Sequence, residues 1–99
     1  MPVKGLKDNT IKTSCAALNA RLADVIAMRL AVKQAHWNVK GPNFIAFHEL
    51  LDGVAAQLAA HEDIIAERAQ ILGGVAQGTA EVVVRETAMK PYPTDLVAD

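Results

Sequence analysis

The sequence predicts an all-α fold, and three observations favour it. Residues 10–38 and 43–73 each carry apolar side chains at every third or fourth position, which is the spacing of one helix face. Neither stretch contains a proline. The composition is 52% hydrophobic but 4% aromatic, an alanine-rich balance that suits close helix packing. At 99 residues the chain has room for one small domain.

The first predicted helix covers residues 10–38 and follows a polar N-terminal arm, residues 1–9. Asn9 or Thr10 is the expected N-cap, because their side chains can accept a hydrogen bond from the first turn. The sequence VKGP at 39–42 breaks the helix. The expected buried side consists of Ile11, Cys15, Leu18, Leu22, Val25, Ile26 and Val32. Cys15 is the only cysteine, so it cannot form an intrachain disulfide and is expected to be a small buried apolar residue.

The second predicted helix covers residues 43–73, with Asn43 as its N-cap and Gly73-Gly74 at its end. At 1.5 Å per residue each helix would be about 42 Å long. The two helices are therefore expected to fold back as a matched antiparallel hairpin. The apolar stripe of the second helix consists of Phe47, Leu50, Leu51, Val54, Leu58, Ile64, Ile65 and Leu72.

The opposite face of this second helix combines acids with alanines. Four polar residues, His48, Asp52, Asp63 and Glu67, fall within an arc of about 100°. The same face carries Ala55, Ala56, Ala59, Ala60 and Ala66. One interpretation is an ordinary solvated face. However, such a face usually mixes long side chains of both charges, whereas alanine lets another helix approach closely.

The spacing of the four polar residues indicates a metal site that is shared between two chains. His48 and Asp52 are four residues apart, as are Asp63 and Glu67, so each pair can hold one ion from adjacent turns. His48 and Glu67 are separated by about 28 Å along the axis, which excludes a common ion within one chain. The four positions are symmetric about the middle of the helix, between residues 57 and 58. An antiparallel copy would place His48 opposite Glu67 and Asp52 opposite Asp63, giving two identical sites across a two-fold axis.

The segment after the second helix is ambiguous. Three valines within residues 79–87 suggest a strand, but Thr79-Ala80-Glu81 can open a short helix, which we favour. The sequence KPYPTD then holds an extended turn, with Thr94 or Asp95 as the N-cap of a helix that would begin at Leu96. A two-helix hairpin cannot bury an apolar stripe on each helix by itself. The expectation is half a bundle, completed by an absent half, by another chain or by a second hairpin.

The charge balance favours no particular class of partner. The net charge is −1, and no signal peptide or apolar run of spanning length is present, so we expect a cytoplasmic protein with no membrane segment. The arm carries Lys4 and Lys7, which could contact DNA phosphates but are more typical of a solubilising terminus.

Three motifs together, KQAHWN, FHELLD and EDIIAER, resemble the Dps proteins, the small ferritins of starved bacterial cells. The likeness extends from Asn9 to Asp95. It implies a ferritin-like four-helix bundle, of which this chain holds the first two long antiparallel helices and the short crossover helix at 79–87. Residues 10–99 would then be a ferritin-like domain that stops before its third and fourth long helices.

The resemblance also implies a ferroxidase centre at a two-fold subunit interface. Carried over by motif, its ligands are His36, His48 and Asp52 from one chain with Asp63 and Glu67 from the other. Without the family, His36 alone would be explained by interaction with the C-terminus of its helix. The implied substrates are Fe²⁺, up to two ions per site, and hydrogen peroxide, with Fe³⁺ mineral stored in a dodecameric shell of identical subunits. Zinc or manganese could occupy the same ligands without turnover.

Several alternatives stay open at this point. The family also implies DNA coating for some members, which would make the protein nucleoid-associated. A truncated, inactive helical hairpin is a third interpretation. Beside the ligands, Trp37 is either an electron donor or a packing residue. His61 is expected to be a core histidine, and Glu49 and Glu62 are expected to be surface or interface acids.

Overall fold

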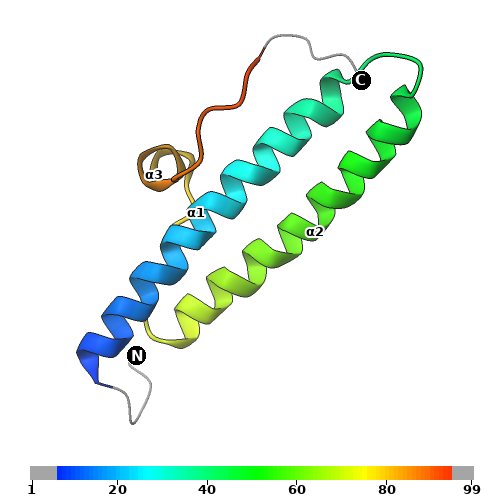
Figure 1. The fold of residues 1–99 in the computed structure, drawn as a ribbon. Coiled ribbons are helices and arrows are strands. Elements are labelled where there is room, and N and C mark those ends of the chain that lie inside the picture. The colour runs from blue at the N-terminus through cyan, green and yellow to red at the C-terminus, as the bar shows by residue number, and fades with distance from the viewer. Residues whose placement is uncertain (1–6, 95–99) are drawn as a thin grey trace.

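The protein is described here by a computed structural model that covers residues 7–94. Its elements are α1 (Asp8–Asn38), α2 (Phe44–Ile71) and α3 (Ala80–Glu86). The two long helices form an antiparallel hairpin that measures 57 × 23 × 15 Å with α3 beside it (Figure 1). The all-α prediction is confirmed, and the third segment is a helix and not a strand. Among the described residues, no helix is apolar and long enough to span a membrane.

The helix ends lie close to the predicted positions, with one correction at the start of α1. Lys7 is the N-cap there, because its carbonyl oxygen accepts from the Ile11 N–H at 3.0 Å. The predicted caps, Asn9 and Thr10, both lie inside the helix, so neither of them is the N-cap. The helix includes the last two residues of the segment predicted as an arm. Lys4 and the helix predicted from Leu96 lie outside the described residues.

The glycine pair after α2 ends that helix as predicted. Gly73 has a φ of 94°, a left-handed value that glycine adopts without strain. Its N–H donates to the Gln70 carbonyl at 2.9 Å, and the Gly74 N–H donates to Ala69 at 3.0 Å. These bonds turn the chain back along α1.

Two alanines of α2 are buried where this helix packs against α1. Ala55 and Ala69 are both buried there, and the Cys15 thiol lies 3.8 Å from the Ala69 carbonyl oxygen. Nearer the middle of the hairpin, an ion pair joins Arg29 of α1 to Glu62 of α2. Of the five alanines predicted on the acidic face, Ala55 is buried but Ala56 and Ala60 are exposed, so α1 does not cover that face as a whole. Cys15 is half-buried, less covered than expected.

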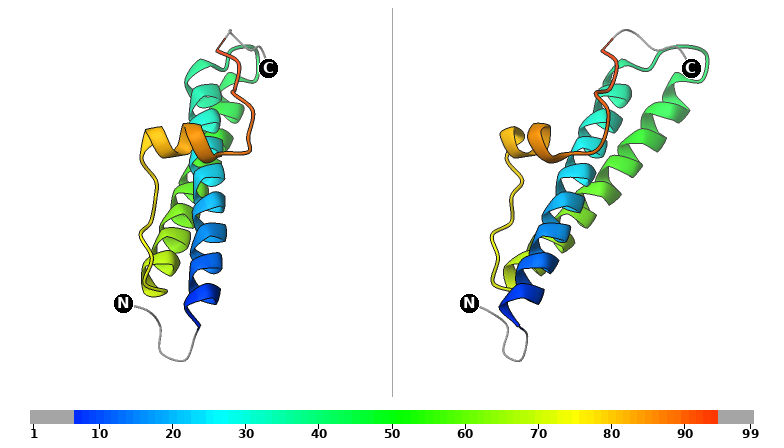
Figure 2. Two further views of the ribbon diagram at one scale, coloured as in Figure 1. Left: turned by 90° about the vertical axis from the view of Figure 1, so that its left-hand side faces the viewer. Right: turned by 60° about the vertical axis from the view of Figure 1, so that its left-hand side comes forward.

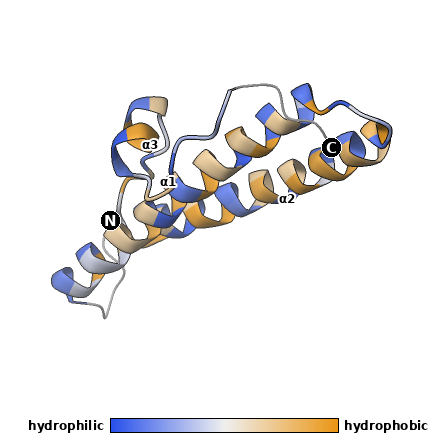
Figure 3. Cartoon of the chain, turned by 45° about the horizontal axis from the view of Figure 1, so that its top comes forward, coloured by the Kyte–Doolittle hydropathy of each residue, from blue (hydrophilic) through white to orange (hydrophobic). Residues whose placement is uncertain are grey.

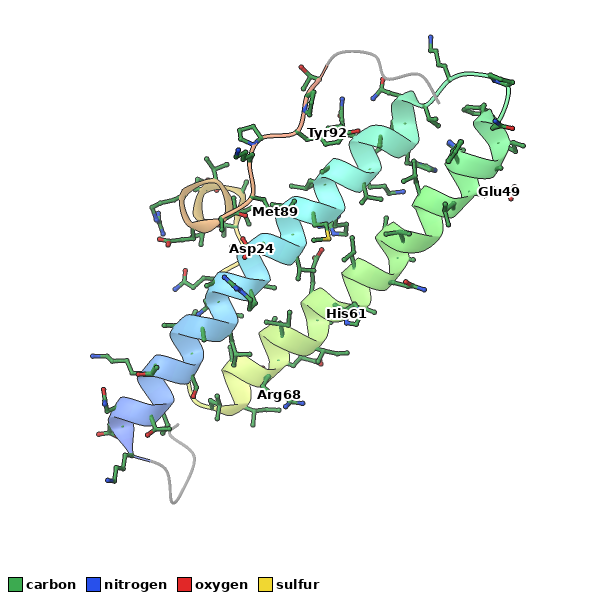
Figure 4. All side chains as sticks on the ribbon, viewed as in Figure 1. Asp24, Glu49, His61, Arg68, Met89 and Tyr92 are labelled. Carbon is green, nitrogen blue, oxygen red and sulfur yellow. The ribbon has the colours of Figure 1, made fainter. Side chains whose placement is uncertain are left out.

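The apolar stripe of α2 is only partly covered within the described residues. Phe47, Leu50 and Ile64 are exposed, with Leu50 at 60%, and hydrophobic residues recur along both long helices (Figure 3). In a hairpin each helix can share only one face with the other, so part of the α2 stripe has no described element to pack against. His61 projects from α2 and is exposed (Figure 4). Within residues 7–94 the prediction of a core histidine is therefore wrong, because no described element covers that side.

The connection between α2 and α3 lies along α1, and α3 crosses α1 (Figure 2). The Asn19 side chain holds the connection: it donates to the Val75 carbonyl at 3.0 Å and accepts from the Gln77 N–H at 2.8 Å. The Thr79 hydroxyl caps α3 by accepting from the Val82 N–H, as predicted. The side of α1 away from α2 is therefore closed by the chain itself.

Candidate metal centre

Three of the five predicted ligands lie near one another where the two long helices approach their connecting turn, although within one chain they are not arranged as a metal-binding group. His36 lies in the last turn of α1, and His48 and Asp52 lie on the first turns of α2. Since the helices are antiparallel, the end of α1 meets the start of α2. The i, i+4 spacing then places His48 and Asp52 on the same face of α2.

The two imidazole rings are stacked. Their centroids are 3.8 Å apart with 24° between the ring planes, and His36 is 8% exposed. The Nδ1 atom of His48 lies 3.0 Å from the backbone carbonyl oxygen of His36. A carbonyl oxygen can only accept, so Nδ1 carries the proton and donates. This tautomer leaves the His48 Nε2 lone pair available to a metal ion, the usual arrangement of a histidine ligand.

His36 is also held in a form that can bind a cation. Burial lowers the pKa of His36, and the neighbouring His48 and Lys33 lower that pKa further, against an opposing effect of the Asp52 carboxylate. A lowered pKa favours the neutral ring, which is the form with a free lone pair. Among residues 7–94, the buried Nδ1 of His36 has no hydrogen-bond partner. Its Nε2 atom lies 3.8 Å from Oδ1 of Asp52.

Asp52 is 60% exposed and pairs with a cation of its own chain. The Lys33 ammonium donates to Oδ1 at 2.8 Å. This bond and the lysine charge hold the pKa of the Asp52 carboxyl below its usual range, so the carboxylate form is favoured. Sequence reasoning missed Lys33. The available signal was its position three residues before His36, which places both side chains on one face of α1.

The other two predicted ligands are not part of this group. Asp63 and Glu67 are exposed, further along the same uninterrupted helix α2. The rise of the helix places Glu67 about 28 Å from His48. Among the described residues, no set of three or more His, Cys, Asp or Glu side chains is arranged to hold a metal ion. One chain therefore does not bring the five predicted ligands together.

The flanking residues divide between the chain's own interface and its surface. Glu62 is paired with Arg29 between the two long helices, and Glu49 is exposed. Trp37, next to His36, is 65% exposed. Neither acid lies with the imidazoles, so the donors gathered at this end are two rings and one carboxylate. Nitrogen and oxygen donors of this kind suit iron, zinc or manganese.

Comparisons with known proteins agree on one family. A family model described as Ferritin-like domain matches residues 15–98. The DNA protection during starvation protein of Agrobacterium fabrum is 52% identical over 91 residues, which cover 92% of this chain and 56% of that protein. A Mycobacterium smegmatis Dps structure superposes with a TM-score of 0.93 at 28% identity, covering 99% of this chain and 59% of that one. DpsA14 from Streptomyces coelicolor gives 0.91 at 38% identity, covering 99% and 58%. The chain spans about half the length of the curated relatives it matches.

Proposed function

Because the chain belongs to the Dps family of ferritin-like proteins, we propose that it oxidises Fe²⁺ at sites built by two copies of itself. Iron storage and DNA protection are functions of this family. The proposal for this chain is narrower: His36, His48 and Asp52 of one protomer meet Asp63 and Glu67 of its partner across a two-fold axis. Since an isologous contact repeats itself, each pair of protomers carries two identical sites.

One observation carries the proposal. The two imidazoles and Asp52 gather at one end of the hairpin, whereas Asp63 and Glu67 are exposed on the same straight helix too far away to reach them. An antiparallel copy of α2 exchanges these two ends. The exposure of both acids and of Asp52 leaves the surface accessible to that copy.

The chemistry follows from the donor set. The neutral rings and carboxylates bind Fe²⁺ and leave positions for the oxidant. Two ferrous ions give up one electron each to hydrogen peroxide, which takes two protons and leaves as two molecules of water. Because both electrons arrive together, no hydroxyl radical is released. The Fe³⁺ product then moves into the hollow of a dodecameric shell and is stored there as mineral. Zinc or manganese would occupy the same donors without turnover.

DNA protection is part of the name of the Agrobacterium fabrum relative and is a property of that protein. In this chain, Lys7 is exposed just before α1. It is the one described lysine of the N-terminal arm, and a single lysine there is a small electrostatic footprint for a nucleic acid, since affinity rises with the number of phosphates that are neutralised. We therefore place iron oxidation first.

The test uses two variants that damage opposite halves of the site. We expect Asp63→Ala and His48→Ala each to reduce the initial rate of peroxide-driven Fe²⁺ oxidation at least about ten-fold, because each removes a ligand. If the two variants are co-expressed in equal amounts and assemble at random, about a quarter of the sites combine two intact halves. The mixed assembly should recover about a quarter of the wild-type rate.

The mixture distinguishes a shared site from a site within one chain. If every ligand came from a single chain, the mixed assembly would be as inactive as the separate variants. Glu49→Ala is the matched control, since Glu49 is an exposed acid of α2 outside the proposed ligand set. An unchanged rate in Asp63→Ala itself would refute the ligand assignment.

A further inference from the structure

We propose that Lys33 holds the place of the metal ion at Asp52, so that a divalent cation must displace the lysine ammonium in order to bind. This inference rests on the proposed function, because it concerns the same site. It assigns to Lys33 the part of a competing internal cation, which sets how tightly the site binds metal.

The geometry places the lysine and the metal on the same atom. Oδ1 of Asp52 accepts from Lys33 at 2.8 Å, and the same oxygen faces Nε2 of His36 at 3.8 Å. An ion shared by His36 and Asp52 would lie about 2.1 Å from that oxygen. The ammonium and the ion would then be no more than about 5 Å apart, and two like charges at that distance repel each other. Lys33 must therefore leave Oδ1 when an ion arrives.

The surroundings allow the lysine to leave. The Lys33 side chain is 29% exposed, so part of it already contacts water. The lysine side chain is a flexible four-carbon stem with a compact, strongly hydrated charge. Its ammonium can therefore swing out into the solvent without a change in the helix. The pair is thus an exchangeable contact. It neutralises Asp52 until a cation of higher charge takes its place, which disfavours monovalent ions.

A second ion pair in the same interface provides the comparison. Arg29 lies one turn before Lys33 on α1 and pairs with Glu62 on α2. Both pairs join a cation of α1 to an acid of α2, but Glu62 is not among the proposed ligands. Removing the Arg29 charge changes the net charge as much as removing the Lys33 charge. Only the loss of Lys33 frees a ligand oxygen.

The experiment measures Co²⁺ binding by the assembled protein, by calorimetry and by the visible absorption of the bound ion. We expect Lys33→Met to raise Co²⁺ affinity about three- to five-fold, the size of an exposed ion pair that no longer competes. Arg29→Met should leave the affinity within about two-fold of wild type. Lys33→Arg keeps the charge and should bind Co²⁺ like wild type. Thermal unfolding of metal-free Lys33→Met should begin at a slightly lower temperature, opposite in direction to the gain in affinity.

The outcomes separate this inference from the function on which it rests. If Asp52→Asn lowers Co²⁺ affinity but Lys33→Met does not raise it, the site stands and the competing lysine is refuted. If Arg29→Met raises the affinity as much as Lys33→Met, the effect is one of overall charge, and direct displacement is again refuted. If Asp52→Asn leaves Co²⁺ binding unchanged, Asp52 is not a ligand, and both proposals fail.

Discussion

Two aspartates on opposite sides of the hairpin show how differently the same side chain is used. Asp24, on α1, accepts from the Thr87 hydroxyl and the Ala88 N–H, each at 2.8 Å, and pairs with Arg21 at 3.1 Å. Its side chain is 20% exposed. Asp52, on α2, is 60% exposed and has the exchangeable lysine as its main partner.

The difference separates a structural carboxylate from a binding one. The Asp24 carboxylate accepts hydrogen bonds from the segment that follows α3 and fixes that segment beside α1. Met89 and Tyr92 belong to this segment (Figure 4). Among residues 7–94, Asp52 accepts from Lys33 and lies 3.8 Å from His36, so its carboxylate retains acceptor capacity. A buried or bridging carboxylate with several donors stabilises the fold, whereas one with spare capacity is available to a ligand.

Replacing Asp52 should impair activity, whereas replacing Asp24 should impair stability, and these are the largest effects that we expect. Asp52→Asn should reduce the rate of Fe²⁺ oxidation at least about ten-fold, because a charged ligand is lost, with little change in the urea midpoint. Asp24→Ala should leave metal binding unchanged but lower the free energy of unfolding by about 2 kcal/mol, since two donors lose a charged acceptor. Oxidation kinetics and urea titration of both variants provide the measurement. Comparable losses of stability would remove the distinction.

The packing between α1 and the end of α2 can be probed at Gly74. A Cβ atom at this position would lie 2.6 Å from the Cys15 thiol and 3.1 Å from its Cβ, closer than any ordinary contact. Gly74→Ala should therefore lower the free energy of unfolding by about 1–3 kcal/mol, the cost of overpacking. The second substitution Cys15→Ala removes the sulfur and should recover part of that loss. Additive losses in the double variant would show that the thiol is not the obstacle.

The smallest effect is a pH dependence of the Asp24 contribution. The hydrogen bonds from Thr87 and Ala88 lower the pKa of Asp24, so the folded protein holds this carboxylate more firmly than the unfolded chain, in which the pKa is about 4. The stabilisation is fully present above that value and is lost as the pH falls through the lower, folded pKa. The difference in unfolding free energy between wild type and Asp24→Asn should narrow between pH 5 and pH 2, roughly. A constant difference would mean that the charge does not contribute.

The extent of the helices was predictable because the signals are local. Gly73-Gly74, the VKGP break and the Thr79 cap lie within a few residues of the ends that they determine. The start of α1 was not, because its N-cap is Lys7, which makes no side-chain capping hydrogen bond, so no capping residue marks that end in the sequence.

The candidate site was predictable only where its residues share a helix. The i, i+4 spacing paired His48 with Asp52, but His36 entered through the family motif, because its stacking on His48 is a contact between helices. The roles of Lys33 and Asp24 also depend on tertiary contacts, with residues 19 and 63 positions away. No periodicity along one helix contains such information. The same reason explains the error at His61, whose exposure depends on what covers α2.

The uninterrupted course of α2 has a consequence for how the sequence can vary. From Asp52 to Asp63 the helix is uninterrupted, so its rise and turn per residue fix the spacing between the two halves of the proposed sites. Inserting a single residue in that interval would shift Asp63 by about 1.5 Å and rotate it by about 100°, away from the partner protomer. Length changes should therefore be tolerated in the turn between the long helices, and selection should remove them from the middle of α2.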